Sequence, residues 1–144
     1  MKTKLTLMFL ALTAGLAFGH EGIELGPNKG RIVEFSDNET MHGEVTVKDG
    51  KMHVALLDKD MKPVKVDAQA LVATAGTREK PAKLEVAKDA AGFTLPVPGE
   101  DEWLILQFKG DATAKSVTAR LHYNTKTCPP CGQPEWRCAC GDKK

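Results

Sequence analysis

Aromatic residues are scarce in this chain of 144 residues, and charge of one sign is not in excess. Phe, Trp and Tyr make up 6% of the sequence, and 20 basic residues stand against 19 acidic ones, for a formal net charge of +1. Proteins that bind nucleic acids or membrane surfaces usually carry a basic excess, and single strands are bound by stacking on aromatic side chains. The composition therefore argues against a nucleic-acid partner and against a membrane-surface partner.

Catalytic motifs are missing as well. The sequence contains no Gly-x-Ser-x-Gly, no phosphate-binding loop and no plausible serine or cysteine triad. The acidic runs at 58–60 and 100–102 lack the alternation of oxygen ligands that a calcium loop requires, and we interpret them as solvated turn charges. We expect a protein that is not an enzyme.

Long apolar runs are absent after the first residues of the chain. Residues 1–19 have the character of a secretory signal peptide, with Lys2 and Lys4 before a short apolar stretch and small residues at Ala17 and Gly19. Cleavage after Gly19 makes His20 the mature N-terminus, and cleavage after Ala17 is the alternative. We expect a periplasmic or otherwise extracytoplasmic protein, soluble and without membrane insertion after signal cleavage.

Period-two alternation runs from Arg31 to Tyr123, and no segment has a convincing amphipathic helical pattern. Asp49-Gly50 predicts a two-residue hairpin turn of type I′ that pairs Lys48 with Lys51. Eight or nine short strands separated by turn residues predict an all-β fold, an immunoglobulin-like antiparallel β-sandwich. We expect an N-terminal arm at 20–29, the sandwich at 30–124 and an irregular Cys-rich tail at 125–144, appended to the sandwich and not part of it.

The hairpin register also predicts which side chains face the core. One face is expected to be buried, and it carries Val45, Val47, Met52, Val54 and Leu56. The other is expected to face solvent, and it carries His42, Glu44, Thr46 and His53. In the last strand, alternation likewise places His122 outward.

The segment Gly26-Pro27-Asn28-Lys29-Gly30-Arg31-Ile32-Val33-Glu34 resembles a Gly-Pro-His-Gly-Gly-Arg-(apolar)-(apolar)-Glu segment of small exported sandwich domains. These occur in, or precede, periplasmic adaptor subunits of heavy-metal efflux pumps of the resistance-nodulation-division type. The segment 54–64 is similar to a strand and turn of the same domain. The resemblance implies a sandwich fold, metal handling and an efflux-pump component as partner. Asn28 stands where the family often has histidine.

Cysteine is absent from the first 127 residues, and all four cysteines follow in a Cys-x2-Cys-x6-Cys-x-Cys pattern: Cys128, Cys131, Cys138 and Cys140. Four thiolates so close can surround one zinc or copper ion. In an oxidising compartment the same thiols can close two disulfides that cross from 128/131 to 138/140. A redox pair is the third reading of Cys-x2-Cys, but it needs a helix N-terminus that the prolines and glycine do not predict.

Two histidines are further candidate metal ligands. The amine and imidazole of a mature N-terminal His20 can chelate copper(II), and His122 is close enough in sequence to join the thiolates. We therefore expect an exported protein that binds a transition metal and sequesters, delivers or senses it beside a heavy-metal efflux system. The alternative is a structural or interaction module of the cell envelope whose tail is stapled by disulfides.

Overall fold

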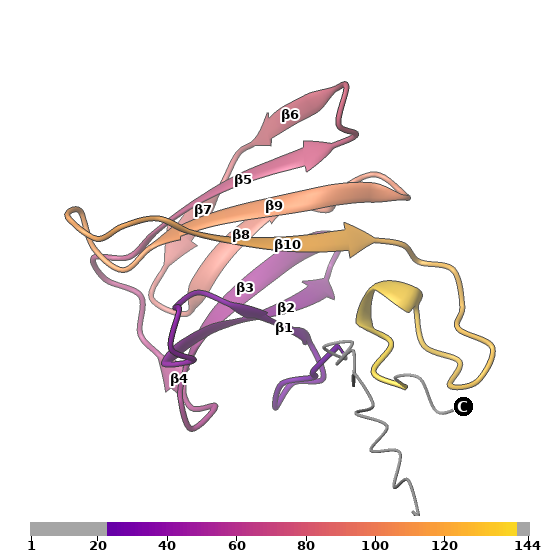
Figure 1. Ribbon diagram of the computed structural model, residues 1–144, viewed down its shortest axis with the longest axis horizontal. Coiled ribbons are helices and arrows are strands. Elements are labelled where there is room, and N and C mark those ends of the chain that lie inside the picture. The colour runs from indigo at the N-terminus through magenta and orange to yellow at the C-terminus, as the bar shows by residue number, and fades with distance from the viewer. Residues whose placement is uncertain (1–22, 141–144) are drawn as a thin grey trace, which may run out of the picture.

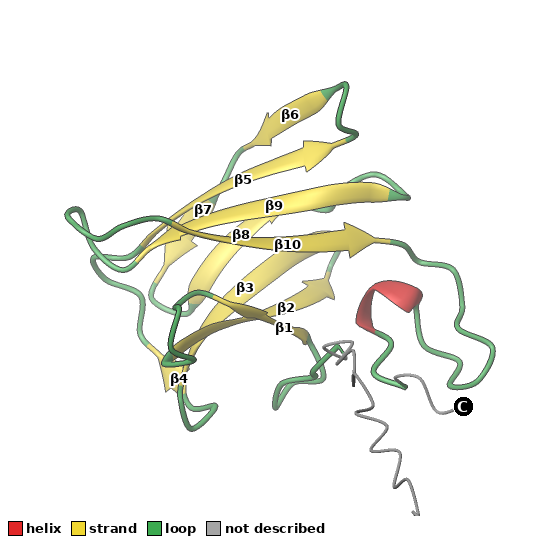
Figure 2. Cartoon of the chain, in the orientation of Figure 1, coloured by secondary structure: helices red, strands yellow, loops and turns green. Residues whose placement is uncertain are grey.

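A computed structural model describes residues 23–140, so the predicted signal peptide and His20 lie outside the described residues. The described part is all-β (Figures 1 and 2). Its elements in chain order are β1 (Arg31–Glu34), β2 (Met41–Lys48), β3 (Lys51–Asp58), β4 (Pro63–Val64), β5 (Ala70–Gly76), β6 (Pro81–Leu84), β7 (Ala87–Asp89), β8 (Gly92–Pro96), β9 (Glu102–Lys109), β10 (Val117–Tyr123) and the 3₁₀ turn η1 (Glu135–Arg137).

The strands form two antiparallel sheets. The six-stranded sheet has the order β1-β2-β3-β8-β7, with β4 also paired to β3, and the four-stranded sheet has the order β10-β9-β5-β6. The predicted strands are confirmed, and the structure adds the short strand β7. Within residues 23–140 no helix is long and apolar enough to cross a membrane.

The β2–β3 hairpin has the predicted register. Lys48 pairs with Lys51 and the ladder continues antiparallel along both strands. At the turn, Asp49 has φ = 53° and Gly50 has φ = 70°, the left-handed conformation that a type I′ turn requires at both positions. The two-residue signal in the sequence therefore fixed which residues of these strands face one another.

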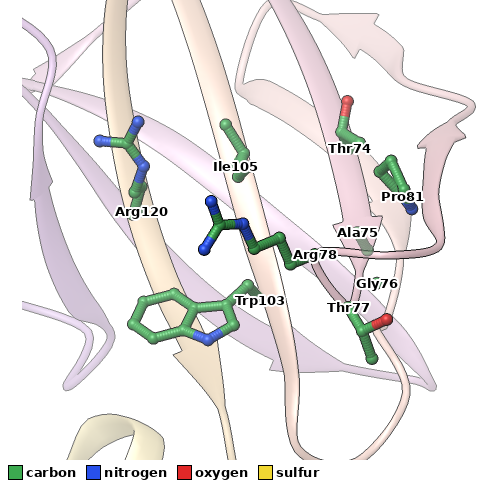
Figure 3. A pocket seen from close by; sticks show the side chains of 9 residues that line it. All are labelled: Thr74, Ala75, Gly76, Thr77, Arg78, Pro81, Trp103, Ile105 and Arg120. Carbon is green, nitrogen blue, oxygen red and sulfur yellow. The ribbon is translucent and has the colours of Figure 1, made fainter.

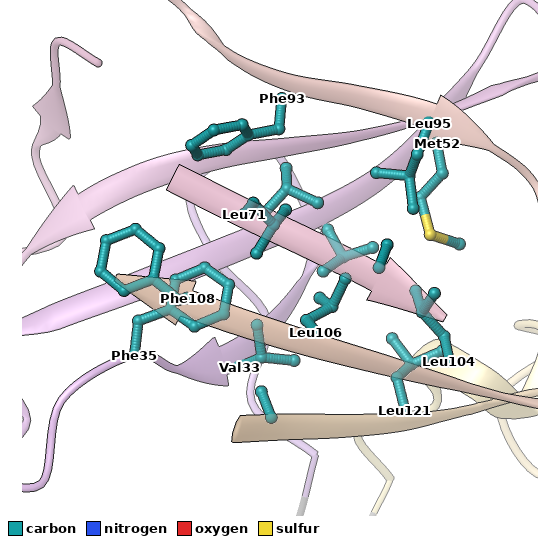
Figure 4. Close-up of a cluster of buried hydrophobic side chains, with 14 of the residues drawn as sticks. Val33, Phe35, Met52, Leu71, Phe93, Leu95, Leu104, Leu106, Phe108 and Leu121 are labelled. Atoms are coloured by element: carbon teal, nitrogen blue, oxygen red, sulfur yellow. The ribbon is translucent and has the colours of Figure 1, made fainter. Parts of the chain in front are cut away.

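Side chains from both sheets share one hydrophobic cluster (Figure 4). Phe35, which follows β1, stacks on Phe108 of β9 with ring centroids 4.5 Å apart, so an aromatic pair bridges the two sheets. Val45, Met52, Val54 and Leu56 are completely buried, as the register predicts. Val47 was also expected in the core but is 40% exposed, and this prediction is wrong; it lies beside the turn at the end of the hairpin.

The opposite face of the hairpin was expected to be solvent-facing, and this is wrong for two residues. Glu44 is completely buried because the loop at 26–30 covers it. Its carboxylate accepts hydrogen bonds from the backbone N–H groups of Asn28 (2.7 Å) and Gly30 (3.0 Å) and from the side-chain amide of Asn28 (2.9 Å). A buried carboxylate needs such partners, and Asn28 thus has a structural role.

His42 is the second exception, with an exposed fraction of only 4%. Its Nδ1 lies 2.8 Å from a carboxylate oxygen of Glu34, the residue opposite it on β1, and donates a hydrogen bond there. His53 is half-buried, with its Nδ1 3.1 Å from the hydroxyl of Thr94. Period-two alternation alone predicted that both histidines face solvent. Contacts from neighbouring strands instead bury His42 and partly bury His53.

The tail after β10 folds back onto the sheets. Trp136 of η1 is 4% exposed and belongs to the hydrophobic cluster, with its ring 5.6 Å from that of Tyr123. Arg31 of β1 donates a hydrogen bond of 2.9 Å to the carbonyl oxygen of Trp136. The expectation of a tail that takes no part in the core is wrong at Trp136, because this indole completes the packing around the end of β10.

Candidate metal centre

The first pair of cysteines lies in a tight turn. The backbone N–H of Cys128 donates to the carbonyl of Gln133, and the N–H of Gly132 donates to the carbonyl of Cys128, both at 2.8 Å. Gly132 has φ = 70°, a left-handed conformation that glycine adopts without steric cost. This turn places Cys128 and Cys131 on one side of the loop.

The second pair follows η1, whose position is fixed from both sides. The N–H of Glu135 donates to the carbonyl of Lys126 (2.9 Å), and the N–H of Trp136 donates to that of Asn124 (3.0 Å). Arg137 donates to the side-chain oxygen of Gln133 (2.9 Å) and so links the segment of the second cysteine pair to the turn that carries the first. The buried indole of Trp136 anchors this segment to the sheets, and Cys138 and Cys140 follow directly after it.

The four sulfur atoms converge within 4.8 Å of one another. Sγ of Cys128 lies 3.3 Å from that of Cys140, Sγ of Cys131 lies 3.4 Å from that of Cys138, and Cys138 and Cys140 are 2.7 Å apart. A tetrahedral zinc site with metal–sulfur bonds of about 2.3 Å has sulfur–sulfur edges of about 3.8 Å. The three separations are shorter than this edge, the outer limit of 4.8 Å is longer, and no disulfide joins any of the four cysteines.

The sulfurs differ in their exposure to solvent. Cys128 is 9% exposed, Cys138 and Cys140 are half-buried, and Cys131 is exposed. Within residues 23–140, one side of the centre therefore rests on the protein and the other is exposed. An incoming ligand can reach the centre from that open side.

The crowded thiols perturb one another's ionisation. Hydrogen bonding from Cys140 lowers the pKa of Cys138 to about 7, and the backbone N–H of Cys140 acts in the same direction. Because Cys138 holds the negative charge, the pKa of Cys140 is raised well above the ordinary thiol value. The pKa of Cys128 is raised too, chiefly through Cys138. The thiolate of Cys138 thus forms readily, and a bound cation would stabilise the thiolates of Cys128 and Cys140.

Of the two histidine candidates, only His122 is among the described residues, and it does not lie in this centre. His122 is outside the group of four cysteines; its ring stacks on Trp103 at 4.9 Å and its Nε2 lies 3.0 Å from a carboxylate oxygen of Asp101. His20 lies outside the described residues. Sequence reasoning also missed Trp136 and Arg31, which position the second cysteine pair. A large apolar residue between two cysteine pairs is the signal that could have indicated Trp136.

No protein-family model matches the chain, and no curated protein or solved structure matches it either. The chemistry of the four thiols is therefore the observation that bears most directly on function.

Proposed function

We propose that this chain is an exported protein that binds one transition-metal ion through Cys128, Cys131, Cys138 and Cys140. The convergence of four free sulfurs within 4.8 Å carries the proposal. Thiolates are soft ligands that select zinc or copper(I) over calcium and magnesium. Zinc, which takes four thiolates in a tetrahedron, is the first candidate metal, and copper is the second.

A role in holding and passing on metal is supported by the open side of the centre. Four thiolates fill the coordination sphere of a tetrahedral ion, but Cys131 is exposed and Cys138 and Cys140 are half-buried, so solvent and solutes contact part of the ligand set. A thiolate of an acceptor protein can therefore reach the ion while some of the original ligands still hold it. We place the protein beside a heavy-metal efflux system, as the resemblance at 26–34 implies, where it sequesters, delivers or senses metal without catalysing a reaction.

The remaining parts of the proposal concern fold and compartment. The two antiparallel sheets with a shared core, bridged by Phe35 and Phe108, support an immunoglobulin-like sandwich. The sequence pattern of residues 1–19 supports export. Since the sandwich positions the tail, it serves here as a scaffold for the thiolate centre.

The test is titration of reduced, anaerobic full-length protein with cobalt(II), followed by its displacement with zinc. Four-thiolate binding predicts one ion per chain, tetrahedral cobalt absorption and sulfur-to-metal charge-transfer bands. Cys138→Ser should abolish or strongly weaken binding, whereas His122→Ala is the matched control and should leave it unchanged. Absence of metal, together with two alkylation-resistant disulfides in protein isolated anaerobically without chelators, would overturn the proposal.

One observation supports the alternative of a structural module with a disulfide-stapled tail, so this alternative is tested together with metal binding. The contacts at 3.3 and 3.4 Å join Cys128 with Cys140 and Cys131 with Cys138, which is the crossed pairing expected of a disulfide-stapled tail. Peptide mapping under non-reducing conditions should then find these two bonds. A structural or interaction module would contain them in every preparation from the native compartment, and added reductant would be needed before any metal binds.

A further inference from the structure

A second candidate site lies on the outer face of the four-stranded sheet, away from the hydrophobic cluster (Figure 3). It is a pocket of about 410 Å³, formed by β5, β9 and β10 and by the loop between β5 and β6. Trp103 and Ile105 of β9 point outward here, because alternation along the strand buries Leu104 and Leu106. This volume is in the range of small-molecule sites.

Trp103 is 50% exposed, yet its ring has a stacking partner. On one side its ring stacks on His122 at 4.9 Å, and His122 is in turn held by Asp101 at 3.0 Å. On the neighbouring strand β5, the residue opposite Trp103 is Gly76, and the backbone of Lys80 and Pro81 packs where a side chain of that residue would lie. The indole, held by His122, therefore forms an apolar wall of the pocket.

Two guanidinium groups line the same pocket from different segments. Arg78 comes from the loop after β5, and Arg120 comes from β10, opposite Ile105. Neither forms an ion pair with a carboxylate anywhere in residues 23–140, and no Asp or Glu lines the pocket. The hydroxyl groups of Thr74 and Thr77 complete a polar edge around an otherwise apolar surface.

We infer that this pocket binds a small organic anion in which a ring carries an acidic group. The ring would lie against Trp103 and Ile105, and the acidic group would be bound by Arg78 and Arg120, whose planar guanidinium groups suit carboxylates and sulfonates. Aromatic acids and acidic sugars share this chemistry. The site is separate from the four cysteines and does not depend on bound metal.

The experiment uses a matched pair of fluorescent probes on the full chain: 1-anilinonaphthalene-8-sulfonate and its neutral analogue N-phenyl-1-naphthylamine, which lacks the sulfonate. We expect the double variant Arg78→Gln/Arg120→Gln to bind the sulfonate about tenfold more weakly, since it loses two partly exposed ion pairs, and to bind the neutral probe as before. Trp103→Ala should weaken binding of both probes. Lys48→Gln/Lys59→Gln, which removes two exposed charges elsewhere, should change neither.

Displacement of the sulfonate by indole-3-acetate or by glucuronate then identifies the kind of ring, and displacement by either one supports the site. The inference is overturned if the Arg78/Arg120 variant retains the affinity of the original chain, if the lysine control loses as much affinity, or if neither acid displaces the probe. Circular dichroism of each variant establishes that it is folded, so that a loss of affinity refers to the pocket.

Discussion

Replacing Trp136 with alanine tests whether the tail is part of the folded core. The indole is 4% exposed and packs on Tyr123. A buried tryptophan removes about 200 Å² from water, and about 25 cal/mol per Å² gives about 5 kcal/mol. Measured Trp→Ala costs in cores are about 3–5 kcal/mol. The tail of the variant can detach, and the rest of the protein then contains no cavity. We therefore expect a loss of stability at the lower end of this range, about 3 kcal/mol.

The assay is equilibrium unfolding in urea of the reduced, metal-free protein, monitored by circular dichroism. Trp103→Ala is the matched control: it removes the same side chain from a half-exposed position and should cost less than about 1 kcal/mol. In a Trp103→Phe background Trp136 is the remaining tryptophan, so its emission should shift to longer wavelength when the tail undocks. The reasoning is refuted if Trp136→Ala costs no more than Trp103→Ala.

Three further predictions address the hairpin, the covered carboxylate and the thiols. Val54→Ala should lower the free energy of unfolding by about 1–3 kcal/mol because it leaves a cavity, and His53→Ala by less than about 1 kcal/mol; the reverse order in urea unfolding would contradict the observed register. Glu44→Gln places an amide N–H group among N–H donors and should cost about 1–3 kcal/mol; unchanged stability would mean that the loop at 26–30 does not depend on the carboxylate. In metal-free reduced protein, the alkylation rate of Cys138 should reach half its maximum near pH 7, since its pKa is lowered to about 7 and the thiolate is the reactive form. Cys140 should stay unreactive at that pH, because its pKa is raised. Alkylation of all four thiols together, with one midpoint near pH 9, would disprove this.

Much of the fold follows from local signals. Asp49-Gly50 set the hairpin register because both positions need positive φ, and alternation then correctly placed Val54 in the core. Alternation cannot say what covers the second face of a sheet. Glu44 is buried by a loop that precedes it in the chain, and His42 by its position against β1, so both predictions failed for lack of tertiary information.

The candidate metal centre was likewise predicted only in part. Residue type and spacing were enough to predict that four cysteines converge, because the segment is short and turn-rich. Spacing did not show which sulfurs are open to solvent or which thiol ionises first, since both depend on how the tail sits against the sheets. Trp136 and Arg31 determine that position, and they are 105 residues apart in the chain.

The hydrogen bond between Arg31 and Trp136 has a consequence for the order of folding. Arg31 belongs to one sheet and Tyr123, the aromatic partner of Trp136, to the other. The surface that receives the tail thus exists only once both sheets have come together, and long-range contacts of this kind form late because they close large loops. The tail therefore docks late in folding, and the four sulfurs take their place against the sheets only in a chain whose two sheets have already joined.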